Sequence, residues 1–172
     1  MIYLSAYLIT DFANSVRDLL GWDRTTWEKN FTENNEAYKS AWTRVLLSER
    51  FWESLGYNAD ARELLSLCTQ NDKLRIVMDM PSYERGAALA NANGFVIDKL
   101  RRFMNKYFRE FSDFPISVAT TLAQMKFEKG LLIDSRQAMC DEWCRLNNNA
   151  QAAVCHIDMP STKIKLSNFG IG

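Results

Sequence analysis

Three cysteines and the only histidine of the chain lie close together in the sequence, at Cys140, Cys144, Cys155 and His156. Cys140 and Cys144 are one helical turn apart, so both thiols would share a helix face. Four nitrogen and sulfur ligands are the tetrahedral set that zinc prefers. However, structural zinc ligands usually come as closely spaced cysteine pairs on turns, and neighbouring strand residues point to opposite faces. We therefore expect reduced thiols packed as small hydrophobic groups, without a metal ion or cofactor, and keep these residues as the metal-site candidate.

The same residues could instead serve nucleophilic catalysis, with a cysteine as the nucleophile and His156 as its base. Asp158, two residues further on, would lie on the same strand face and could orient the imidazole. A small enzyme centred on His156 and the cysteines is therefore one alternative function. Four other carboxylates were considered for acid–base or metal-dependent hydrolysis: Asp72, Asp79, Asp141 and Glu142. Their spacing matches none of the patterns that these reactions need. Glycine-rich phosphate loops are also absent from the sequence.

A basic strip is the second candidate site, formed by Lys99, Arg102, Lys106 and Arg109, with Arg101 beside them. The spacing of these cations places them in one line along a helix. Such a line could follow a phosphate backbone or contact an acidic partner. The alternative is a solvated helix face whose long aliphatic stems cover the rim of the core.

The helix that carries this strip has the clearest periodicity in the chain. Between Phe95 and Phe111, at about 100° per residue, the apolar side chains share one wide face. A face this wide predicts a central helix covered on more than one side. Gly94 indicates a weak point near Asn91–Gly94, where one long helix could bend or two helices could meet.

Helical patterns also occur over Ile2–Leu20, Asn58–Gln70, Ile116–Lys129 and Asp134–Leu146. Alternation predicts a strand over Lys73–Met80, with further strand candidates at Ala152–Met159 and Lys163–Leu166. We therefore expect a mainly α, single-domain helical bundle over residues 1–172, built around the central helix at about 95–111. A small two- or three-stranded sheet would make it α+β. A loose tail is expected from about residue 168.

The composition limits the function classes. The 172 residues carry a formal net charge of zero, which argues against a strongly acidic DNA mimic and a strongly basic histone-like binder. No apolar run is long enough to span a membrane, and the sparse cysteines indicate a reducing cytoplasm. Plentiful aromatic residues and no catalytic set favour a non-enzymatic protein that contacts a larger protein or ribonucleoprotein, as phage and mobile-element inhibitors and adaptors do. The alternative is a nucleic-acid-binding protein that uses the basic strip.

Overall fold

The computed structural model describes residues 1–33, 35–37, 40, 44–45, 48–70, 73–79, 87–119, 130–146 and 153–172. Its strands are β1 (Ile2–Ser5), β2 (Leu74–Asp79), β3 (Ile116–Ala119), β4 (Leu131–Asp134) and β5 (Ala153–Cys155). The helices before β2 are α1 (Ala6–Ile9), α2 (Phe12–Leu20), α3 (Arg24–Glu33), α5 (Glu49–Ser54) and α6 (Ala61–Thr69). Those after it are α7 (Ala87–Tyr107), the 3-10 turn η1 (Arg109–Phe111), α8 (Gln137–Leu146) and α9 (Met159–Ser167).

The strands form one parallel five-stranded sheet in the order β3-β2-β1-β4-β5. The central strand β1 pairs on one side with β2, where Ile2 lies opposite Leu74, and on the other with β4, where Ile2 lies opposite Leu131. The chain therefore builds outward from β1 through β2 to β3, and then crosses to the other side of β1. This crossing makes the gap between β1 and β4 the topological switch point of the sheet.

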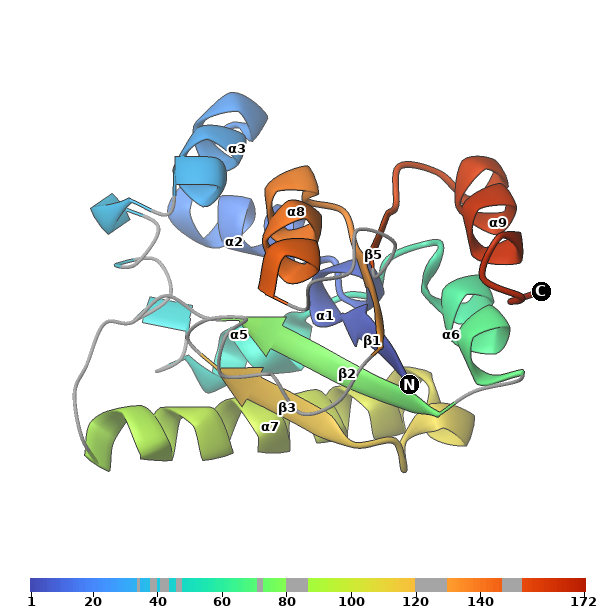
Figure 1. The fold of residues 1–172 in the computed structure, drawn as a ribbon. Coiled ribbons are helices and arrows are strands. Elements are labelled where there is room, and N and C mark those ends of the chain that lie inside the picture. Colours follow the sequence, from blue (N-terminus) through green and yellow to red (C-terminus); the bar gives the residue numbers. More distant parts are fainter. Residues whose placement is uncertain are drawn as a thin grey trace.

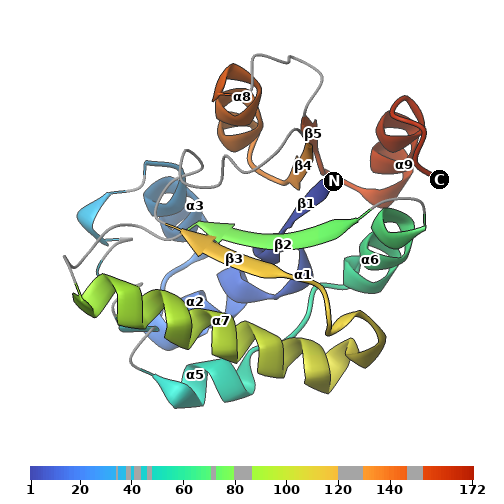
Figure 2. The ribbon, with the colours of Figure 1, turned by 60° about the horizontal axis from the view of Figure 1, so that its bottom comes forward.

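Helices cover both faces of the sheet (Figure 1). On one face, Ile2 and Leu4 of β1 join the main core, to which α2, α5, α6 and α7 also contribute. On the other face, Tyr3 packs against Trp143 of α8, with ring centroids 5.0 Å apart. Figure 2 shows α5 and α7 on the side of the sheet away from α8. Both faces are buried, as expected for a parallel sheet.

The prediction of a mainly α bundle is wrong, because this is an α/β fold with a parallel sheet. Ile2–Ser5 is the central strand and not the start of a helix, and Ile116–Ala119 is a strand where a helix was expected. The rest of that expected helix, residues 120–129, lies outside the described residues. Lys163–Leu166 belongs to α9 and not to a strand.

Other predicted elements are confirmed. Strand β2 lies within Lys73–Met80, and the central helix exists as α7, which continues through residues 91–94 and ends at Tyr107. The structure also places Ile171, in the predicted loose tail, in the main core with 8% of its surface exposed. No helix in the described ranges is both long and apolar enough to cross a membrane.

Local interactions explain several boundaries. Ser5 ends β1 and caps α1, because its hydroxyl accepts a hydrogen bond from the Tyr7 amide at 3.3 Å. Asp158 caps α9 in the same way through the Ser161 amide at 2.8 Å. Gly130 precedes β4, where a Cβ atom would lie 2.6 Å from the Met1 carbonyl oxygen. Only glycine allows β4 to approach β1 this closely.

Candidate functional site

Proteins with open parallel sheets bind ligands at the carboxyl edge of the sheet, at the switch point. Asp79 ends β2 and Asp134 ends β4, on either side of β1, whose end leads into Tyr7. Arg136 follows Asp134 by two residues. The parallel topology therefore brings two carboxylates, a guanidinium and a phenol together from distant parts of the sequence.

Arg136 lies between the two carboxylates and bonds to both. Its Nη1 and Nη2 atoms donate to the Asp79 carboxylate at 2.9 and 2.5 Å. Its Nε and Nη2 atoms donate to the Asp134 carboxylate at 3.0 and 2.8 Å, and its backbone amide donates there at 2.9 Å. The guanidinium also lies 4.9 Å from the centre of the Tyr7 ring, and the Tyr7 hydroxyl donates to the Asp79 carbonyl at 2.7 Å. We call Asp79, Arg136 and Asp134 the edge triad.

The edge triad is a closed network. Burial alone would lower the pKa of Arg136, but the charges of Asp79 and Asp134 outweigh burial and hold this pKa well above its ordinary value. Only 2% of the Asp134 side chain and 15% of the Asp79 side chain are exposed. Every oxygen of the two carboxylates accepts a hydrogen bond from Arg136. The arrangement therefore joins the ends of β2 and β4 across β1 and leaves neither carboxylate unengaged for proton transfer.

The four metal-site candidates do not converge. Cys140 and Cys144 of α8 and Cys155 of β5 line one cavity of about 270 Å³, but His156 does not line it. No group of three or more histidine, cysteine or acidic side chains among the described residues could hold a metal ion. None of the cysteines forms a disulfide. Burial, as the larger cause, and the negative charge of Asp134 raise the pKa of the Cys140 thiol to about 12.

His156 instead joins two helices. Its Nδ1 lies 2.7 Å from the Thr162 hydroxyl of α9, and its Nε2 lies 3.1 Å from the Asp60 carboxylate at the start of α6. The expected partner Asp158 caps α9. Thr162 is fully buried and His156 is only 7% exposed. This arrangement has the order of an acid–histidine–hydroxyl triad, but the hydroxyl is closed to a substrate.

The basic strip is divided in the structure. Arg101 donates to the carbonyls of Ser112 and Phe114, both at 2.6 Å, and so holds the turn between α7 and β3. Arg109 lies beyond the end of α7, in η1. Lys99, Arg102 and Lys106 remain together on α7 and line a hollow.

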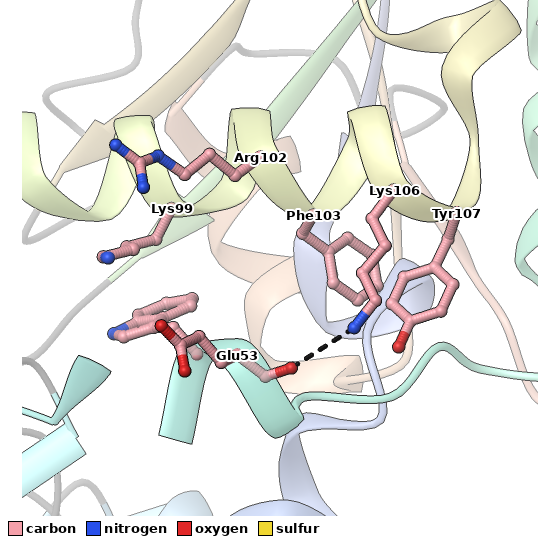
Figure 3. A pocket seen from close by; sticks show the side chains of 7 residues that line it. Glu53, Lys99, Arg102, Phe103, Lys106 and Tyr107 are labelled. Carbon is pink, nitrogen blue, oxygen red and sulfur yellow. Dashed lines mark hydrogen bonds between the residues drawn. The ribbon is translucent and has the colours of Figure 1, made fainter. Parts of the chain in front are cut away.

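The hollow lies between α5 and α7 and has a volume of about 170 Å³. We call it the α5–α7 hollow, and its lining residues are Trp52, Glu53, Lys99, Arg102, Phe103, Lys106 and Tyr107. Figure 3 shows Lys106 reaching from α7 to Glu53, whose backbone carbonyl lies 3.4 Å from the lysine Nζ. A second hollow of about 190 Å³ adjoins it, and Lys106 and Tyr107 line both. The exposed Tyr57 lines this second hollow, with its ring 5.0 Å from that of Tyr107.

Carboxylates balance most of the charge at the α5–α7 hollow. Lys99 is only 7% exposed and pairs with Glu49 at 3.3 Å. Arg102 pairs with Asp98 at 3.1 Å. Lys106 is the exception, because no described carboxylate pairs with it, and its Nζ lies 4.9 Å from the centre of the Tyr107 ring.

Comparisons with known proteins add no relative. Neither the protein-family models, nor the curated proteins, nor the solved structures gave a match to this chain. Sequence reasoning found the cations of the α5–α7 hollow and named Asp79, but it missed Arg136 as the partner of Asp79 and Trp52 as a site residue. The polar residues that follow the apolar run Leu131–Ile133 were the available signal for the edge triad.

Proposed function

We propose that this chain is a cytoplasmic, non-enzymatic binding protein that acts through protein–protein contacts on a larger protein or ribonucleoprotein, as an inhibitor or adaptor does. The observation that carries the proposal is the pair of adjoining hollows on either side of Lys106 and Tyr107. Tryptophan, tyrosine and arginine, which line these hollows, are the residues enriched at the energetically dominant positions of protein interfaces. Two adjoining hollows suit an extended segment of a partner, with one side chain in each.

The charge balance favours a protein partner over nucleic acid. Nucleic-acid binding needs cations that are free to neutralise successive phosphates. In the α5–α7 hollow, Lys99 and Arg102 face Glu49 and Asp98, and the Glu53 carboxylate adds a further negative charge. A polyanion would meet little net positive charge there. A partner segment with a single acidic group would not be repelled in this way.

The buried polar groups at the sheet edge support a non-enzymatic role. In α/β enzymes, the carboxyl ends of the strands supply the reacting groups. Here Asp79 and Asp134 are held by Arg136, and the hydroxyl beside His156 is buried. These groups stabilise the fold, and we place the partner at the two adjoining hollows instead.

Selection from a displayed library of random peptides tests the proposal. Enriched peptides should bind the wild type and lose at least tenfold in affinity for the double variant Arg102→Glu/Lys106→Glu. A control with the same change in charge, Lys29→Glu/Arg145→Glu, places both changes on exposed residues of α3 and α8 and should bind like wild type. Circular dichroism confirms that each variant is folded.

Two results would overturn the proposal. The first is the absence of enrichment, or peptides that bind the wild type and the Arg102→Glu/Lys106→Glu variant equally. The second comes from fluorescent single-stranded RNA and duplex DNA, measured at low and moderate salt. If these bind the wild type, weaken with salt and fail to bind the same variant, the nucleic-acid alternative replaces the protein partner.

A further inference from the structure

Three thiols line one cavity, apart from the two hollows. Residues of α8, β5 and α9 form this cavity, which has a volume of about 270 Å³ and includes Cys140, Cys144 and Cys155 in its lining. We call it the thiol cavity. None of its cysteines forms a disulfide. Cys140 is buried, whereas Cys144 and Cys155 are half-buried, so a small reagent in solution can reach the last two.

The Cys155 side chain lies on the face of the sheet that α8 covers. In β5, Val154 joins the main core on one face, and Ala153 packs on the other face in the cluster that contains Trp143 of α8. Cys155 shares the face of Ala153, because alternate residues of a strand point to the same side. Its thiol therefore lies on the side of the helix that carries the other two thiols of the cavity.

Two successive carbonyls hold the sulfurs of Cys140 and Cys155. The Cys140 Sγ lies 3.9 Å from the Asp134 carbonyl oxygen, and the Cys155 Sγ lies 3.5 Å from the carbonyl oxygen of the next residue, Ser135. The Asp134 carbonyl also accepts a hydrogen bond at 2.8 Å from the amide of His156, which directly follows Cys155. The Cys140 thiol and the backbone next to Cys155 are thus held at one oxygen atom.

The electrostatics of the thiol cavity agree with this geometry. Burial, and then the charge of Asp134, are the main causes that raise the pKa of the Cys140 thiol. The charges of Cys155 and then Cys144 are the next causes, although Cys144 is only one helical turn from Cys140. Since charge interactions weaken with distance, Cys155 is a near neighbour of Cys140 in the folded chain despite their separation in the sequence.

We propose that the thiol cavity is a site of oxidative modification, in which a peroxide converts Cys155 and Cys140 into a reversible disulfide. The half-buried Cys155 reacts first with hydrogen peroxide. Its thiolate attacks one oxygen, the O–O bond breaks, and a sulfenic acid and hydroxide form. The Cys140 sulfur then attacks the Cys155 sulfur, the S–O bond breaks, and the thiol proton leaves with the hydroxyl group as water. The two thiols lose two electrons, which the peroxide gains.

Burial suits Cys140 to the second step and not to the first. Its high pKa keeps it a thiol, and its 3% exposure protects it from reagents in solution. A sulfenic acid at Cys155 is already beside it, so the slow attack of a thiol becomes an intramolecular step. A small thiol can reopen the bond by attacking the half-buried Cys155 sulfur. In a reducing compartment, disulfides are usually transient and redox-sensing, and this pair fits that pattern.

A tryptic map of the oxidised protein tests the proposal. Wild type is treated with hydrogen peroxide, its remaining thiols are blocked in denaturant, and the chain is digested. Cys140 and Cys144 fall in the peptide 137–145, Cys155 falls in the peptide 146–163, and Cys68 falls in the peptide 63–73. We expect the first two peptides to become linked, with fragmentation placing the bond between Cys140 and Cys155. Dithiothreitol should separate them, and Cys68, which does not line the cavity, should stay a thiol.

Variants and a denatured control decide whether the fold builds this site. Cys155→Ser should abolish the link, and Cys144→Ser should keep it; if either variant does not fold, fragmentation of the wild-type peptides decides alone. In the folded protein, links between Cys155 and Cys140 should outnumber all others at least tenfold, and in concentrated urea this preference should disappear. A bond to Cys144 instead, oxidation of Cys155 to sulfinic acid with no link, or the same preference in urea would each overturn the proposal.

Discussion

Replacing Arg136 with methionine should cost much of the stability of the protein. The change removes the cation between Asp79 and Asp134 and leaves the Asp134 carboxylate, which is 2% exposed, buried without a counter-charge. Breaking a buried ion pair by removing one partner costs about 3–5 kcal/mol. Asp79, at 15% exposed, can regain water more readily, so we expect most of the loss to come from Asp134. For a chain of this length, the loss corresponds to a fall of roughly 6–20 °C in Tm.

Urea denaturation followed by tryptophan fluorescence measures this loss as a free energy of unfolding. Arg145→Met is the control, because Arg145 is 72% exposed and lies 3.9 Å from Glu142, and surface pairs of this kind contribute roughly 0–1 kcal/mol. Adding Asp134→Asn to Arg136→Met should recover part of the stability, because it removes the buried charge. If Arg136→Met costs no more than Arg145→Met, or if the added Asn gives no recovery, Arg136 does not neutralise a buried Asp134 charge.

Two further predictions follow from shifted pKa values. Burial raises the pKa of the Cys68 and Cys140 thiols to about 12. At pH 8 these two thiols should therefore resist iodoacetamide, while the half-buried Cys144 and Cys155 react. Peptide mapping that finds Cys68 or Cys140 labelled first would contradict this. The hydrogen bond from the Ser161 amide lowers the pKa of Asp158 below its ordinary value of 3.8. The ionised Asp158 therefore stabilises the fold, as the cap of α9, at pH values above 3.8. This stabilisation is lost as the pH falls through the lowered pKa of the folded protein. The stability difference between wild type and Asp158→Ala should therefore be present at pH 7 and vanish in strong acid, and a difference that is independent of pH would contradict the prediction.

The sequence revealed β2 and concealed β1 and β4 for a physical reason. In β2, the polar Lys73 precedes the strand and Arg75 and Asp79 interrupt its apolar residues, so alternation is visible. Ile2–Ser5 and Leu131–Ile133 are buried on both faces and carry no alternation. A short apolar run of this kind cannot be distinguished from part of a buried helix by periodicity alone.

The opposite error occurred at Lys163–Leu166, where charged and apolar residues alternate. The capping bond of Asp158 and the proline at Pro160 begin a helix there, and local start signals outweigh a short alternation. Ile164 is 68% exposed, so one of the two apolar residues that suggested a strand does not enter the core. Capping signals would have been the better guide in this segment.

The edge triad could not be predicted without the sheet. Asp79 was visible as an isolated carboxylate, but Arg136 is 57 residues away, and only the pairing of β1 with both β2 and β4 brings the two together. Only some of the residues that line the α5–α7 hollow could be predicted from the sequence. Its cations follow from the spacing on one helix, whereas Trp52 comes from α5 and joins them only where the two helices pack.

The same packing changes the interpretation of the basic strip. On an isolated helix, Lys99, Arg102 and Lys106 form a line of positive charge, which favours a phosphate backbone. In the folded chain, Glu49 and Asp98 pair with the first two, and Lys106 keeps no carboxylate among the described residues. One unbalanced ammonium is too little for a polyanion. This balance of charge leads us to propose a protein partner.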